Sequence, residues 1–216
     1  MNDMRQLTAL GRRIEDDSFA IIDAEVSAHA HGPLEWQVVR RVIHATADFE
    51  FASLMAFSAG AIHAGVTALR EGCPLVFDVK MIAAGVSQER LAAYGCETHC
   101  FISDDDVIAA AKAAESTRAI ESMSKARRLG ILEGAIVAVG NAPTALLELA
   151  RLIQAGEARP ALVIGVPVGF VSAAESKDRI RESAVPSIVS RGRKGGSPVA
   201  VAVLHALLSL SAQAPT

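Results

Sequence analysis

The sequence is poor in cysteine and in aromatic residues, and it has no long apolar run. Three cysteines among 216 residues, an odd number, do not fit the disulfide framework of a small secreted protein, so we expect reduced thiols and a cytoplasmic location. The longest apolar stretch, residues 198–212, is shorter than the ~18 residues that a membrane-spanning helix needs. No membrane partner is therefore expected. With aromatic residues at 4%, the core must be built from Ala, Val, Ile and Leu.

Excess positive charge and two nucleotide-binding motifs are also missing. The formal net charge is −3, which argues against nucleic acid as the main ligand. No G-x-G-x-x-G follows a predicted strand and no G-x-x-x-x-G-K-S/T occurs, which argues against a dinucleotide enzyme and a nucleoside triphosphatase. An apolar fraction of 51% excludes disorder. The length and even composition indicate a single domain over residues 1–216.

One short cluster has the residue types of a metal site. Cys96, His99 and Cys100 lie close together in the chain. On a strand, however, the two cysteines face one side and the histidine the other, so the three side chains do not converge on one ion. We therefore expect structural thiols and no metal here.

Short β-branched segments alternate with Ala- and Leu-rich segments of helical periodicity. The predicted strands are residues 74–78, 97–102, 135–139, 161–164 and 186–190. The predicted helices are residues 18–28, 34–45, 105–129, 142–154, 172–182 and a final helix that follows Ser197. Three of the strands are unbroken apolar runs, typical of strands covered on both faces. The alternation predicts an α/β fold: a doubly wound, mostly parallel sheet of about five strands with extra N-terminal helices.

Glycine-rich segments follow three of the predicted strands, at residues 140–144, 165–169 and 191–197. In a doubly wound sheet the ligand binds beyond the carboxyl ends of the strands. Glycine allows a ligand to approach the main chain closely, and the N–H groups of the following helix favour an anion. Each loop alone is equally consistent with an ordinary turn, but three on one edge predict an acidic ligand.

His44 is the titratable residue that best fits a catalytic role. It ends an amphipathic segment in which Arg41 lies three residues back and Arg40 four, so at least one arginine shares its helix face,. A nearby cation lowers the pKa of an imidazole and a helix C-terminus raises it, and both keep His44 near the range of proton exchange at physiological pH. By contrast, His63, His99 and His205 lie in apolar patterns and are expected to be core or interface residues.

Several blocks of the chain resemble the precorrin-8X methylmutase family of corrin (vitamin B12) biosynthesis, over nearly the full length. The similar stretches are residues 18–22, 41–45, 117–118, 140–146, 165–177 and 186–197. The block GVPVGFVSAAESK, at residues 165–177, is the most specific of them. The histidine of the family falls on His44. Where many members continue with a small Cys-Gly-Ser-type turn, this chain reads Thr46-Ala47-Asp48.

The resemblance implies an isomerase that moves a methyl group between adjacent carbons of a tetrapyrrole, giving hydrogenobyrinate or cobyrinate. Such a shift sends no electrons to an external acceptor, so no cofactor is expected. The resemblance implies that His44 is the acid that protonates a ring nitrogen. For the carboxylates on the rim of the macrocycle we expect hydrogen-bond donors and cations. The candidates are Ser18, Arg41, Arg118, Gly169, Lys177 and Arg193.

The resemblance also implies a homodimer with the site near the subunit interface. The apolar terminal helix and the alanine-rich segment 59–68 are the expected contact surfaces. Two alternatives stay open from the residues alone: a non-catalytic corrinoid carrier, and an α/β phosphosugar or nucleotide enzyme that uses the glycine loops for phosphate. Whether the substrate is metal-free or carries cobalt is also open.

Overall fold

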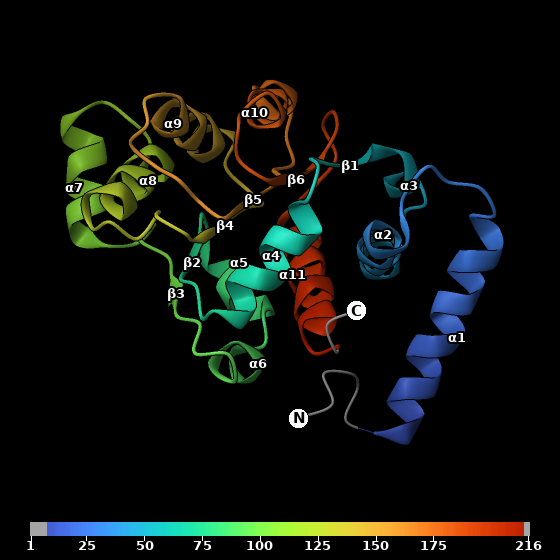
Figure 1. The fold of residues 1–216 in the computed structure, drawn as a ribbon. Helices are drawn as coiled ribbons and strands as arrows, with labels where there is room; N and C mark the ends of the chain where they lie inside the picture. The colour runs from blue at the N-terminus through green and yellow to red at the C-terminus, as the bar shows by residue number, and fades with distance from the viewer. Residues whose placement is uncertain (1–7, 214–216) are drawn as a thin grey trace.

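Six strands form one sheet in the computed structural model, which describes residues 8–213 (Figure 1). The strands lie side by side in the order β1-β6-β5-β4-β2-β3. Their bounds are β1 Met55–Phe57, β2 Leu75–Phe77, β3 Thr98–His99, β4 Ile136–Val139, β5 Leu162–Gly165 and β6 Ser187–Ser190. Strands β2 to β6 pair in parallel, and β1 pairs antiparallel with β6. The predicted fold class is thus confirmed, with β1 as an additional edge strand.

Helices cover both faces of this sheet. The N-terminal half contains α1 Ala9–Glu25, α2 Pro33–Thr46, α3 Phe51–Leu54, α4 Ala61–Arg70, α5 Lys80–Gly85 and α6 Gln88–Ala92. The C-terminal half contains α7 Asp105–Ala113, α8 Arg118–Arg128, α9 Pro143–Gln154, α10 Ala173–Arg181 and α11 Ser197–Ser211. In Figure 1, α8, α9 and α10 lie on one side of the sheet and α4, α5 and α11 on the other. This two-sided arrangement is that of a doubly wound fold.

Strand β4 shows why the apolar runs predicted buried strands. Successive side chains of a strand point to opposite faces. Ile136 and Ala138 therefore join the core beneath α2, α4 and α11, whereas Val137 and Val139 join the core beneath α8 and α9. All four side chains are fully buried. A strand of this kind cannot alternate apolar and polar residues, because it has no solvent face.

Two helix predictions were wrong in their bounds. The segment 105–129 is two helices instead of one: Glu115 adopts a positive φ of 49°, and the hydroxyl of Thr117 accepts a hydrogen bond from the backbone N–H of Ile120 to begin α8. The first helix begins at Ala9 instead of Ser18, because the hydroxyl of Thr8 accepts a bond from the N–H of Gly11 and caps it. Both starts are hydroxyl caps of the N-terminal backbone donors.

Of the two expected dimer contact surfaces, the terminal helix was wrong, since it belongs to the core of the protomer, and segment 59–68 is buried on one face only. Helix α11 runs through the middle of the molecule between α2 and α4 (Figure 1), and most of its residues are buried. The alanine-rich face of α4 packs inward as well. A Cβ on its Gly65 would lie only 2.8 Å from Leu162 of β5. Most of α11 and the inward face of α4 are therefore closed to a partner, while Ala59 and His63 remain exposed.

Helix α1 stands at the margin of the molecule, where it packs along α2 (Figure 1). Its attachment is largely polar: Asp23 accepts hydrogen bonds from the Trp36 indole and from Arg40, both at 2.7 Å. Along residues 8–213, no helix combines the length and the apolar character that crossing a bilayer requires.

Candidate active site

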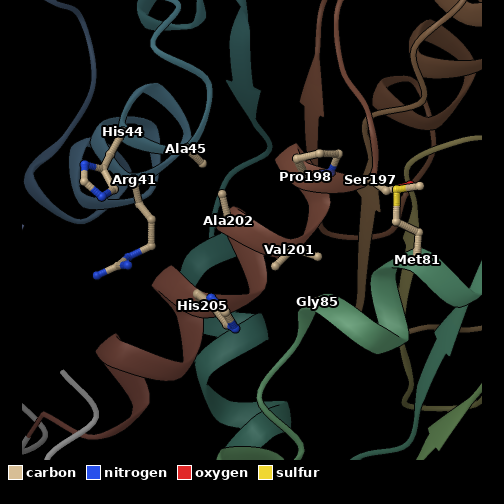
Figure 2. A pocket seen from close by; sticks show the side chains of 10 residues that line it. All are labelled: Arg41, His44, Ala45, Met81, Gly85, Ser197, Pro198, Val201, Ala202 and His205. Carbon is tan, nitrogen blue, oxygen red and sulfur yellow. The ribbon is translucent and has the colours of Figure 1, made fainter. Parts of the chain in front are cut away.

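A cavity of about 380 Å³ opens between α2, α5 and α11 (Figure 2). Its lining residues are Arg41, His44, Ala45, Met81, Gly85, Ser197, Pro198, Val201, Ala202 and His205. The wall is mostly apolar, and its titratable side chains are two imidazoles and one guanidinium. The cavity borders the first turn of α11, which directly follows the β6–α11 loop, so it reaches the carboxyl edge of the sheet, where the fold places a ligand.

His44 lies on the last turn of α2 with its side chain exposed. The ring of Phe19, from α1, meets it edge-on at a centroid distance of 5.3 Å. Figure 2 shows His44 and Arg41 projecting from α2 on one side of the cavity, across from α11. The imidazole is therefore oriented by an aromatic neighbour and accessible to a ligand, which is the geometry that proton exchange requires.

Arg41 lines the cavity but is already paired. Its Nη2 donates to Oε1 of Glu15 at 2.7 Å, and the Glu15 carboxylate is itself buried. A guanidinium carries five N–H donors, so Arg41 has donors left for a ligand carboxylate. Arg40, by contrast, binds Asp23 and is not part of the cavity wall. Of the two arginines near His44, the structure brings only Arg41 into the site.

His205, which its apolar pattern predicted to be a core or interface residue, lines the cavity. It lies on α11, and its Nε2 accepts a hydrogen bond from the backbone N–H of Ser87 at 3.2 Å. Burial, and to a lesser degree Arg90 and Arg41, lower the pKa of His205 to about 4. The ring is therefore neutral at physiological pH. A helical stripe at Pro198, Val201 and His205 was the available sequence signal for this wall.

Asp78 was also missed, and it shapes the carboxyl edge of the sheet. Its side chain is fully buried at the end of β2. It accepts three backbone hydrogen bonds, from the N–H groups of Gly140, Asn141 and Ala142, at 2.7–3.0 Å. Burial raises the pKa of Asp78, while these bonds act in the opposite direction. The carboxylate thereby fixes the β4–α9 loop against the start of α11, where a Cβ on Gly140 would lie 2.8 Å from Cα of Ser197.

Lys177 lies next to the β6–α11 loop instead of lining the cavity. It is fully buried, and its Nζ donates to the carbonyl of Lys194 at 3.0 Å and to the hydroxyl of Ser190 at 3.4 Å. Burial lowers the pKa of Lys177 to about 8. Lys194, in turn, pairs through its Nζ with Asp48, just beyond the end of α2. This chain of contacts ties the loop before α11 to the helix that carries His44.

Two other candidates lie on neighbouring loops of the same edge. The N–H of Gly169 donates to the carbonyl of Arg193 at 3.1 Å, which joins the β5–α10 and β6–α11 loops. The exposed guanidinium of Arg193 lies 5.6 Å from the ring centroid of Phe170, whose side chain is 83% exposed. Glycine is required in this loop, because a Cβ on Gly195 would collide with the carbonyl of Val166.

The remaining two candidates lie farther from the cavity wall. Arg118 is exposed at the start of α8, next to the contact between the hydroxyls of Thr117 and Thr144, so it faces the same edge of the sheet. The hydroxyl of Ser18 donates to the carbonyl of Ile14 within α1. The structure thus groups His44 and Arg41 in one cavity, and distributes the other candidates around it.

The cysteine cluster does not form a metal site. Cys73 and Cys96 are buried and Cys100 is half-buried, and the thiol of Cys96 donates to the carbonyl of Leu69. Within residues 8–213, no three His, Cys, Asp or Glu side chains come together as a metal ion would require.

A second, larger hollow of about 760 Å³ lies between α9 and α10. Its arginines are neutralised by neighbours on the same helices: Arg151 binds Glu148, and Arg179 pairs with Glu175. No histidine lines it. The chemistry therefore points to the smaller cavity.

Fold and cavity together define an α/β enzyme-like protein with a ligand site at the carboxyl edge of its sheet, where an imidazole and a guanidinium on one helix border an apolar wall. The sequence pattern of the precorrin-8X methylmutase family matches residues 13–210, and the chain belongs to this family. Members are isomerases of cobalamin biosynthesis that move a methyl group, and this chain is such an isomerase.

Individual relatives agree along almost the whole chain. The cobalt-precorrin-8 methylmutase of Leptospira interrogans is 54% identical, over 97% of this chain and 98% of the relative. That of Priestia megaterium is 48% identical, over 97% and 92%. The crystal structure of a precorrin-8X methylmutase from Thermus thermophilus superposes with a TM-score of 0.88 at 51% identity, covering 93% of this chain and 96% of that one.

Proposed function

We propose that the chain moves a methyl group between adjacent carbons of precorrin-8X or cobalt-precorrin-8, with the imidazole of His44 as the acid. The observation that carries this proposal is the placement of His44 and Arg41 on one wall of a mostly apolar cavity. The apolar wall suits the face of a macrocycle, and the two polar groups suit its nitrogens and its carboxylates.

The reaction is an internal rearrangement. A carbon–methyl bond breaks at one ring carbon while another forms at its neighbour, so electrons stay within the substrate and no redox cofactor is needed. The site must instead control where the protons of the macrocycle reside. His44 holds a proton at a ring nitrogen as the methyl moves, a contribution worth roughly a hundredfold or more in rate. The remaining acceleration comes from binding the product-like geometry tightly.

The macrocycle with its acid side chains is larger than a cavity of about 380 Å³, so its rim must extend over the neighbouring loops. Arg41 binds one rim carboxylate from inside the cavity. Gly169 and Arg193 are placed on adjoining loops to meet another, and Lys177 holds the loop that carries Arg193. Arg118 and Ser18 lie at the outer margin, where they reach the substrate only if it spreads beyond the cavity.

A second copy of the chain would close the open side of the site. Helix α1 carries an apolar stripe of Leu10, Ile14 and Ile21, each more than half exposed, at spacings that put the three on one helix face. An exposed stripe of this kind is typical of a subunit interface. Light scattering of the full chain tests this arrangement: a dimer is expected, and Ile14→Ser with Ile21→Ser should yield monomers. The three free cysteines fit a cytoplasmic enzyme.

The substitution His44→Ala tests the catalytic assignment. The variant is expected to bind hydrogenobyrinic acid with nearly unchanged affinity and to lose conversion of precorrin-8X by at least a hundredfold. The matched control is His63→Ala, since His63 is an exposed histidine on α4 that lies outside the cavity. Normal turnover by His44→Ala would show that the acid lies elsewhere. Titration of the wild type with nucleotides tests the alternative of a phosphosugar or nucleotide enzyme. Tight binding of nucleotide without binding of the corrin ligand would overturn the proposal.

A further inference from the structure

The cavity contains a second imidazole, whose surroundings differ from those of His44. His205 enters from α11, whereas His44 enters from α2 on the opposite side (Figure 2). The Nε2 atom of His205 lies 3.2 Å from the backbone nitrogen of Ser87. Ser87 caps α6 through its hydroxyl, so its backbone N–H is held in place by a local structural motif. The ring of His205 is therefore fixed by the fold before any ligand binds.

This hydrogen bond determines which ring nitrogen carries the proton. A backbone N–H can only donate, so Nε2 of His205 must present its lone pair, and the proton of the neutral ring lies on Nδ1. The charged groups around the ring are Arg90 of α6, Arg41 of α2 and Glu15 of α1. Burial and the two arginines oppose a second proton more strongly than Glu15 favours it, which lowers the pKa to about 4. The ring stays a neutral Nδ1–H donor throughout the physiological range.

The Nδ1–H group has no acceptor within the part of the chain that the structure describes, residues 8–213. Its residue forms part of a cavity wall, so a ligand in the cavity can provide the missing acceptor. Among the lining residues, the other titratable groups are Arg41, which binds Glu15, and the exposed His44. His205 is thus a neutral donor of the site.

We propose that His205 is a substrate-binding residue that donates from Nδ1–H to an oxygen of an acid side chain on the macrocycle. This inference rests on the proposed function of the same cavity. It divides the work between the two histidines: His44 exchanges a proton, whereas His205 recognises an acceptor and keeps its proton. A neutral donor also holds the carboxylate without adding a second cation beside Arg41, where like charges would repel.

The protonation state is tested first, without substrate. In the full chain labelled with ¹⁵N-histidine, the His205 signals are assigned by their loss in His205→Asn. We expect the chemical shifts of a protonated Nδ1 and an unprotonated Nε2, unchanged between about pH 5.5 and pH 8. A protonated Nε2, or titration of this ring within that interval, would overturn the proposal.

The donor role is tested with a matched pair of substitutions. In His205→Asn, the side-chain amide occupies the position of Nδ1 and can still donate to the ligand. In His205→Gln, it reaches the position of Nε2, which preserves the contact with Ser87 and removes the donor. Titration with hydrogenobyrinic acid should give about tenfold weaker binding for the Gln variant and binding within about threefold of wild type for Asn.

The controls separate this proposal from the proposed function and from misfolding. His63→Gln, on the exposed side of α4, should bind as the wild type does. Because the His44 acid is untouched, the pH profile of turnover should keep its midpoint in the Asn variant.

Equal binding by the Gln variant and the wild type would overturn the donor role alone. If the wild type itself failed to bind the corrin ligand, the proposed function would fail with it. If one variant failed to fold by circular dichroism, the His205 signals would be assigned with the other, and the ¹⁵N shift of Nδ1 in the wild type on addition of hydrogenobyrinic acid would decide the donor role.

Discussion

Two regions of the molecule are stabilised by different kinds of contact: the body, which is the sheet with the helices that cover it, and the margin, which is α1 and its contacts with α2. In the body, the sheet is enclosed by Ala, Val, Ile and Leu side chains on both faces, most of them fully buried. At the margin, α1 is joined to α2 by ion pairs: Glu15 binds Arg41 and Asp23 binds Arg40. Phe19 lies between them, with the guanidinium carbon of Arg40 4.4 Å from its ring centroid.

The candidate site lies at the boundary between these two regions. Its rigid wall comes from α11 of the body, and its titratable wall comes from α2, which α1 supports. Apolar packing tolerates little displacement, whereas a pair such as Arg40 and Asp23, whose carboxylate is partly exposed, is weak and adjustable. The body therefore defines the shape of the cavity, while α1 orients His44 through Phe19 and Arg41 through Glu15.

Truncating a core side chain in the body should have the largest effect on the free energy of unfolding. Leu146 of α9 is fully buried, and its side chain packs so closely over Gly165 that a Cβ there would lie 3.0 Å away. Leu146→Ala should lower the free energy of unfolding by about 3 kcal/mol, because it leaves a void that the sheet cannot close. Urea denaturation measures this. Leu129→Ala, at a leucine that is 55% exposed, should change stability by no more than about 0.5 kcal/mol; equal losses would contradict the packing argument.

Lys177 is a charge inside the apolar body, and its effect depends on pH. Its pKa is about 8 in the folded chain against 10.5 as the ordinary value. Between these two pH values the Lys177 side chain binds more protons in the unfolded chain than in the folded one, so Lys177 contributes a rise in stability with pH across this window, on the order of 2 kcal/mol. Below pH 8 the full penalty of the buried charge applies.

Lys177→Met should remove that contribution, so the stability of the variant relative to the wild type should fall by on the order of 2 kcal/mol from pH 8 to pH 10.5,. The same substitution removes the donor to the carbonyl of Lys194, so the loop that carries Arg193 loses an anchor. Product binding should weaken about fivefold. Thermal unfolding at several pH values gives the first result and corrin titration the second. A stability difference between the two chains that does not change with pH would exclude this contribution of Lys177.

The margin is tested by removing one charge from its more buried pair. In Glu15→Gln, Arg41 keeps a hydrogen-bonding partner but loses the opposite charge, at a cost of about 1–2 kcal/mol. Because α1 packs on α2 and not on the sheet, the cost should appear as local opening. Amide hydrogen exchange in α1 should become about tenfold faster, while exchange in β4 stays unchanged. Asp23→Asn, at a carboxylate that is 41% exposed, is the matched control and should have a smaller effect; uniform acceleration in both elements would count against a separate margin.

The sequence predicted correctly those features that depend only on residues close together in the chain. β4 and β5 are unbroken apolar runs, so their burial follows from their own residues. His44 and Arg41 are one helical turn apart, so their shared wall follows from helix geometry. By contrast, β1 was missed: Met55–Phe57 is three residues long, and only its pairing with β6 makes it a strand.

The missed site residues depend on partners that are distant in the chain. His205 lies 118 residues from Ser87, whose N–H fixes its ring. Asp78 lies 62 residues from Gly140, the first of the amides that it binds. An apolar neighbourhood predicted that these residues are buried or nearly so, but no local pattern encodes a hydrogen bond formed by folding.

A substitution at the end of α2 should have the smallest effect on the free energy of unfolding, and its expected sign is opposite to that of its control. Ala47 closes the helix that carries His44 with a left-handed backbone, φ 51°, which costs an L-residue with a side chain about 1 kcal/mol. Glycine is the usual residue at such a position. Ala47→Gly should therefore raise the free energy of unfolding by about 0.5 kcal/mol, even though glycine gives the unfolded chain more freedom. Ala64→Gly, in the middle of α4, should have the opposite sign and cost about 0.5–1 kcal/mol. Two losses of equal size in urea denaturation would mean that the turn after His44 relaxes to another conformation in solution.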